Sequence, residues 1–123
     1  MIKKWEPDNF ELKKNTVWSF PEHGNWATHD SKYRGNWSPY IPRNIILRYS
    51  DKGNIVLDQF AGGGTTLVEA KLLGRNIIGI DINPLALKYC KEKTSFAYPQ
   101  FPITEKRADN FVRPRVVLLI PVI

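Results

Sequence analysis

The sequence has little of what secreted, membrane or metal-binding proteins depend on. Cys90 is its single cysteine, so no disulfide can form within the chain, which fits a reducing cytoplasm. No apolar run approaches the roughly 18 residues of a membrane-spanning helix, and no apolar segment follows the N-terminal lysines as in a secretion signal. His23 and His29 lack metal-ligand spacing, and we expect them to be exposed or capping. We therefore expect a cytoplasmic protein that uses neither membrane nor metal.

Acidic residues are also in the minority. The 123 residues carry a formal net charge of +6, and we expect residues 1–123 to form one small domain. Such a balance suits a polyanionic partner, because phosphate neutralisation drives nucleic-acid binding. The lysines and arginines are spread along the chain rather than clustered. Charge alone therefore leaves open both a nucleic-acid partner and an ordinary basic protein.

Two regions differ in pattern. Residues 1–40 hold all four tryptophans and show neither a helical nor a strand period. We expect an extended aromatic arm there, whose tryptophans pack against the missing or swapped part of the fold, with stacking on nucleic-acid bases as the alternative. Residues 41–123 are regular, and we expect them to form the core.

The regular region alternates between strand and helix patterns. A strand, a glycine-rich turn, a helix, a second strand and a second helix follow one another, which indicates a right-handed βαβ unit and an α/β fold with a parallel sheet. We expect Thr65 and Asn83 to cap the two helices, and both strands to be buried. The elements expected are helices over 42–49, 65–73 and 84–93, and strands over 55–58, 76–80, 103–106 and 116–120.

The turn after the first strand carries most of the functional information. Gly62 and Gly64 stand between a strand end and a helix start, where backbone can approach a ligand closely. Asp81 ends the next strand about 20 residues on, where a carboxylate can accept hydrogen bonds from ribose hydroxyls. Tight strand-to-helix packing is the alternative for the glycines alone. The turn is neither G-x-G-x-x-G nor a Walker loop, which argues against NAD and ATP.

Three segments resemble a known family. Residues 58–66, DQFAGGGTT, are similar to the D-x-F-x-G-x-G-T-T motif of the DNA amino-methyltransferases that modify cytosine N4 or adenine N6. Residues 33–49 resemble the family segment that closes over the methionine end of the cofactor. Residues 79–84, GIDINP, resemble its ribose-binding motif. The resemblance implies a Rossmann-like methyltransferase fold, S-adenosylmethionine as cofactor and DNA as partner, as in restriction–modification systems.

The resemblance also implies a set of cofactor-binding residues. The turn residues would shape the pocket, Asp81 would bind the ribose hydroxyls, and Asp109 would meet the adenine amino group if it ends a third strand. The full set is Tyr40, Asp58, Phe60, Ala61, Gly62, Gly64, Thr65, Asp81, Ile82 and Asp109.

The family's catalytic tetrapeptide is missing. It reads Asn, Asp or Ser, then Pro-Pro, then an aromatic residue; it follows the fourth strand and holds the flipped base. No Pro-Pro pair occurs here, and residues 120–123, IPVI, stand where we expect it. Residues 38–40, SPY, resemble it with one proline lost but belong to the cofactor-closing segment. We therefore assign no catalytic residue.

The missing tetrapeptide leaves three functions open. The chain is expected to be part of a split or truncated methyltransferase, which would pair with a second chain or a second copy through the edge of strand 116–120. A non-catalytic cofactor- or DNA-binding remnant and part of an RNA methyltransferase are the alternatives.

Overall fold

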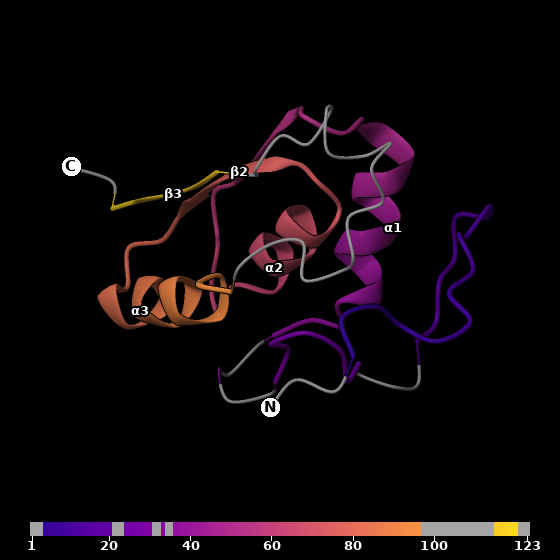
Figure 1. The fold of residues 1–123 in the computed structure, drawn as a ribbon, viewed down its shortest axis with the longest axis horizontal. Helices are drawn as coiled ribbons and strands as arrows, with labels where there is room; N and C mark the ends of the chain where they lie inside the picture. The colour runs from indigo at the N-terminus through magenta and orange to yellow at the C-terminus, as the bar shows by residue number, and fades with distance from the viewer. Residues whose placement is uncertain (1–3, 21–23, 31–32, 34–35, 97–114, 121–123) are drawn as a thin grey trace, which may run out of the picture.

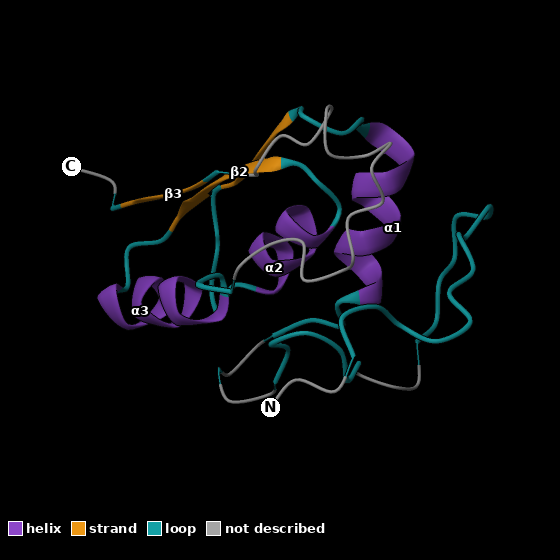
Figure 2. Ribbon diagram, in the orientation of Figure 1, coloured by secondary structure: helices purple, strands orange, loops and turns teal. Residues whose placement is uncertain are grey.

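The described residues form a three-stranded parallel sheet with helices packed beside it. The computed structural model describes residues 4–20, 24–30, 33, 36–96 and 115–120. Figure 1 shows the course of the chain, and Figure 2 shows α2 and α3 lying along one side of the strands. The strand order in the sheet is β1-β2-β3. The elements are α1 (Tyr40–Tyr49), β1 (Ile55–Asp58), α2 (Thr65–Leu72), β2 (Asn76–Ile80), α3 (Pro84–Lys93) and β3 (Val116–Leu119).

The element order confirms the predicted α/β architecture. β1 pairs with β2, and β2 pairs with β3, both in parallel. Each connection carries a helix, as parallel strands require. The arrangement is a partial Rossmann-like methyltransferase fold.

The point at which each helix begins depends on the residue at its N-cap. α1 begins at Tyr40, two residues before the predicted start, because Pro39 already has helical dihedral angles. The predicted capping role of Thr65 is wrong: Gly64 occupies the N-cap of α2 with φ +91°, and no side chain caps that end. For α3 the prediction is confirmed, since the side chain of Asn83 accepts a hydrogen bond from the backbone N–H of Leu85 at 3.0 Å.

The two faces of the sheet differ. On the inner face Val56, Ile77 and Val116 stand in register and pack with Leu67 and Ala70 of α2. The opposite face carries Ile55 and Leu57, which are 70% and 51% exposed. The prediction that β1 is buried is therefore wrong for one of its faces, because the two helices that follow β1 and β2 lie on the same side.

β3 takes a different place from the one expected. It is a strand, as predicted, and ends at Leu119, but it lies beyond β2 rather than beside β1. In a doubly wound sheet of order 3-2-1-4 this is the third position, not the fourth. The expected strand over 103–106 lies outside the described residues. The position of the fourth strand, beside β1, is not filled by any described part of the chain.

The aromatic arm packs on this chain's own core, so the expectation that the tryptophans pack against a missing or swapped part of the fold is wrong for Trp26. Trp26 is fully buried and lies with Val68 and Leu72 of α2 in a second apolar cluster. The arm also reaches the end of α3, where Lys93 pairs with Asp30 at 3.0 Å. The described residues of the arm are thus part of the folded unit.

A buried carboxylate joins the arm to α1 and α2. Glu69 is fully buried on α2; its Oε2 accepts a hydrogen bond from Trp26 Nε1 and lies 3.0 Å from His29 Nε2. Its Oε1 accepts from Arg43 Nη1 of α1 at 3.0 Å, and Arg43 also pairs with Glu6. The expectation of an exposed or capping His29 is wrong, since its side chain is 2% exposed. We call these five residues the Glu69 network.

Candidate functional site

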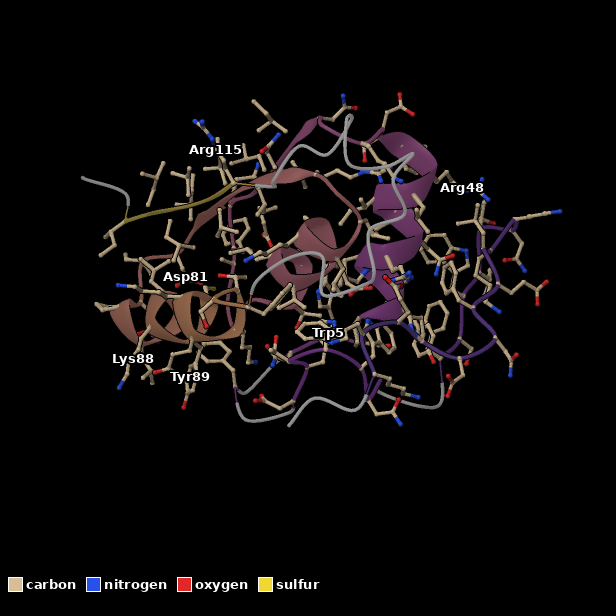
Figure 3. The ribbon with its side chains drawn as sticks, in the orientation of Figure 1. Trp5, Arg48, Asp81, Lys88, Tyr89 and Arg115 are labelled. Carbon is tan, nitrogen blue, oxygen red and sulfur yellow. The ribbon has the colours of Figure 1, made fainter. Side chains whose placement is uncertain are left out.

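The carboxyl ends of β1 and β2 bring several of the predicted site residues together. Because parallel strands end at the same edge of a sheet, Asp58 and Asp81 follow neighbouring strands there. The glycine turn, residues 61–64, leads from β1 into α2 beside them. Figure 3 shows Asp81 between the sheet and α3. This edge is where open α/β sheets bind their ligands.

Asp81 holds the glycine turn against the end of β2. Its Oδ2 accepts a hydrogen bond from the backbone N–H of Gly62 at 2.9 Å, and its Oδ1 accepts from the N–H of Asn83 at 2.8 Å. The N–H of Ala61 donates to the carbonyl of Ile80 at 2.9 Å. The two motifs that are about 20 residues apart in sequence are thus one structural unit.

The middle glycine of the turn is a site residue that sequence reasoning missed. A Cβ on Gly63 would lie 2.3 Å from Asn36 Oδ1 and 2.7 Å from Tyr33 Cβ, closer than such atoms approach. The resembling motif treats this position as variable, so no sequence signal besides the run of three glycines marks it. Tyr33 and Asn36 belong to the segment that the resemblance assigns to cofactor closure, and that segment packs directly on the turn.

Cys90 supports the turn from below. A Cβ on Gly64, at φ +91°, would lie 3.3 Å from the Cys90 sulfur, whose thiol is also 3.4 Å from the carbonyl of Gly62. Burial, helped by the charges of Asp81 and Asp58, raises the pKa of the thiol to about 11. Cys90 is therefore a protonated, packed side chain at neutral pH, as predicted from its position on the helix.

Exposed apolar side chains flank the two acids. Phe60 is 88% exposed and lies two residues after Asp58. Ile82 is 68% exposed and directly follows Asp81. Apolar surface suits a base, carboxylates suit hydroxyl groups, and the uncapped N-terminus of α2 supplies oriented N–H groups. The residues present therefore fit a nucleoside cofactor.

The remaining predicted residues divide into three groups. Ala61 and Thr65 are buried and shape the turn from within. Tyr40 packs against the apolar cluster around Trp26. Its ring stacks on that of Phe20 with centroids 5.4 Å apart and meets the Trp26 ring edge-on at 4.8 Å, so its contact with cofactor stays a prediction. Asp109 lies outside the described residues.

The sequence also led us to expect neither metal binding nor a membrane-spanning helix. Among the described residues, no group of three or more His, Cys, Asp and Glu side chains could hold a metal ion. Within that same part of the chain, no helix has the length and apolar character to cross a membrane.

The parallel sheet, the glycine turn and the acid after β2 define an α/β domain with a partial methyltransferase fold. Residues 2–92 match the profile of the DNA methylase family of N6 and N4 methyltransferases. The chain belongs to this family of DNA amino-methyltransferases.

Similar proteins extend the comparison. The chain is 46% identical over 97 residues to the type II methyltransferase M2.LlaDCHI of Lactococcus lactis subsp. cremoris, covering 69% of this chain and 35% of that protein. It is 33% identical over 94 residues to M.HpaI of Haemophilus parainfluenzae, covering 76% and 30%. With M.BsoBI of Geobacillus stearothermophilus it shares 39% over 70 residues, covering 55% and 14%. The chain thus spans about a third or less of each of these relatives.

Proposed function

We propose that this chain, as one domain, forms the S-adenosylmethionine-binding part of a cytoplasmic DNA methyltransferase that modifies cytosine N4 or adenine N6. The observation that carries the proposal is the joined pair of motifs: Asp81 accepts the Gly62 N–H at 2.9 Å at the carboxyl edge of the sheet. Type II DNA methyltransferases among the relatives support both the substrate and the reaction. The net charge of +6 favours a DNA partner.

Different residues at this edge would contact different parts of the cofactor. When bound, S-adenosylmethionine supplies an electrophilic methyl group on its sulfonium. Asp81 uses one acceptor position of each oxygen for the backbone, and a carboxylate offers about four, so it keeps capacity for ribose hydroxyls. Asp58 accepts the Phe60 N–H at 3.0 Å and sits on the neighbouring strand. Phe60 and Ile82 supply exposed apolar surface for the base.

The groups that hold the target base and orient its amine are not recognisable in this sequence. An exocyclic amine is a poor nucleophile because its lone pair is delocalised into the ring. Positioned oxygens must accept its hydrogens, and a stacking platform must hold the base outside the duplex. The sequence contains no Pro-Pro tetrapeptide that could do both, and the position beside β1 that would carry it is unfilled by described residues. We propose that this chain alone transfers no methyl group.

Calorimetry tests the cofactor proposal. Titration of the chain with S-adenosylhomocysteine should give one site, and Asp81→Asn should weaken binding by about 1–3 kcal/mol, the value of a hydrogen bond to a charged group. Asp51→Asn, an exposed acid in the turn before β1, should change nothing. No heat from the parent chain, or equal affinity of parent and Asp81→Asn, would overturn the proposal. Circular dichroism shows whether each variant stays folded.

A methyl-transfer assay tests the second part. With labelled S-adenosylmethionine and DNA, the chain alone should give only background counts. If it methylates DNA, and either Ser38→Ala or Tyr40→Ala abolishes the activity, the segment before the glycine turn is the acceptor site and the proposal of a missing acceptor is wrong.

A further inference from the structure

Part of the aromatic arm forms a loop that projects from the fold beside α1. Figure 1 shows this indigo segment on the side of α1 that faces away from the sheet. Lys13 fixes the base of the loop, because its backbone N–H donates to Asn44 Oδ1 at 2.7 Å and its carbonyl accepts a hydrogen bond from Arg48. The indole Nε1 of Trp18 donates to the carbonyl of Asn15 at 2.8 Å. Hydrogen bonds at the base and within the loop thus order it.

This loop, residues 13–18, carries a cluster of positive charge; we call it the arm loop. Lys14 is exposed and Lys13 is half-buried. Arg48 lies in the last turn of α1, is exposed, and binds the loop from a segment 35 positions along the chain. A guanidinium has five N–H donors, so the bond to the Lys13 carbonyl leaves donors for an anion. Three cations from two distant segments therefore meet on one ordered surface.

The uncharged side chains of the arm loop suit a nucleic-acid backbone. Asn15 and Thr16 are exposed, and amide and hydroxyl groups of this kind donate to phosphate oxygens. Val17 is 80% exposed although it is apolar, and apolar side chains contact thymine methyl groups at base edges. An ordered loop that combines lysines, small polar donors and one apolar side chain can hold phosphates and touch the groove between them.

Acids are placed so that this surface keeps its positive charge. Asp8, on the arm, pairs with Lys4 at 2.8 Å. On α3 the exposed Lys88 has the exposed Glu92 one helical turn further on, and a carboxylate at that spacing offsets a lysine. Glu11 is exposed on the arm two residues before the loop. It is the acid whose removal should most favour an anion at the arm loop.

We propose that the arm loop and Arg48 form a docking surface for the phosphate backbone of duplex DNA. Lys13, Lys14 and Arg48 each neutralise a phosphate, and Val17 contacts the groove between them. This rests on the proposed function, because an enzyme that extrudes a base has to hold the duplex around it. The surface holds flanking duplex rather than the target base, since Figure 3 shows Arg48 and Asp81 at different ends of the molecule.

The salt dependence of DNA binding tests the surface. The probe is a short fluorescein-labelled DNA duplex, and its anisotropy is followed as the 123-residue chain is added without cofactor. Lys14→Gln should lower the slope of log affinity against log salt by about 0.9 and weaken binding roughly eightfold at about 0.1 M salt, the effect of one lost phosphate contact. Lys88→Gln is the matched control. It removes the same charge from α3, far beyond the Debye length of about 10 Å from a duplex on the arm loop, and should change affinity less than about twofold.

Two further variants separate charge from apolar contact. Glu11→Gln should strengthen binding by about twofold or more, because it removes a negative charge beside the phosphates, whereas Glu92→Gln on α3 should leave binding unchanged. Val17→Ser should weaken binding while the salt slope stays that of the parent, because it removes an apolar contact and no charge. Circular dichroism and melting of each variant show whether a loss reflects docking or folding.

Each outcome decides the proposal. A loss in Lys14→Gln with a gain in Glu11→Gln, and neither change in the α3 controls, supports it. No binding of DNA by the parent chain, equal losses in Lys14→Gln and Lys88→Gln, or tighter binding of duplex RNA of the same sequence would overturn it. The same variants are titrated separately with S-adenosylhomocysteine. A chain that binds DNA through the arm loop but binds no S-adenosylhomocysteine refutes the proposed cofactor site alone, and one that binds S-adenosylhomocysteine but no DNA refutes the docking surface alone.

Discussion

Removing the charge of Glu69 should be among the most damaging single changes in this chain. The carboxylate is fully buried and meets Trp26, His29 and Arg43 at 3.0 Å each. Breaking a buried ion pair costs about 3–5 kcal/mol, because the partner charge stays buried. Arg43 keeps its contact with Glu6, whose side chain is 39% exposed, so the lower end applies. We expect Glu69→Ala to lower the free energy of unfolding by about 3 kcal/mol, out of roughly 5–15 for a small domain.

Urea unfolding followed by tryptophan fluorescence measures this loss. With a slope of about 1.5 kcal/mol per molar urea, the midpoint should fall by about 2 M. Glu69→Gln distinguishes loss of the charged network from loss of side-chain volume. It keeps the volume but removes the charge, and its amide N–H₂ group would face the N–H donors of the network. If the network is responsible, Glu69→Gln loses nearly as much as Glu69→Ala. Glu92→Gln, exposed on α3, is the surface control and should stay within about 0.5 kcal/mol. A Glu69→Gln variant as stable as the parent would refute the reasoning and leave a cavity as the cause.

Three further predictions concern the turn and the helix beneath it. Gly63→Ala should cost about 1–3 kcal/mol, because its Cβ would meet Asn36, and Asn36→Ala should restore part of that loss; an unchanged melting temperature would contradict the contact. Cys90 has a folded-state pKa of about 11 against an ordinary 9.0, so the unfolded chain loses the thiol proton first and stability falls as pH rises between these values. The loss is about 2–3 kcal/mol, and Cys90→Ala should lack it; equal pH slopes of parent and variant in urea unfolding would exclude it. Asn83→Ala should cost about 1 kcal/mol through the lost cap of α3, seen as a lower melting temperature, and no change would show the cap to be dispensable.

Local signals in the sequence were sufficient for most of the core. Asn83 and Pro84 mark the start of α3 because a cap and a first-turn proline act through neighbouring backbone alone. The apolar run of β2 and the acid that follows it were also predictable, since both faces of that central strand are at least half-buried. The family resemblance covers the same stretch, and residues 2–92 match the family profile.

What depends on distant parts of the chain was not predictable. The Glu69 network joins residues up to 63 positions apart, from Glu6 to Glu69, and no periodicity marks either end. The exposure of Leu57 depends on which side the crossover helices take, not on the strand's own residues. The place of β3 beyond β2 likewise follows from pairing, which an apolar run such as VVLL does not specify.

The two bonds that Asp81 accepts from Gly62 and Asn83 affect how the site meets a ligand. They fix the glycine turn and the start of α3 while the chain folds, so the conformational entropy of these backbone atoms is lost before any ligand arrives. In a preorganised site of this kind, little of the binding free energy is lost to ordering the protein. Association should then proceed in a single kinetic phase, with a rate that rises linearly with ligand concentration, because no slow rearrangement of the turn follows the encounter.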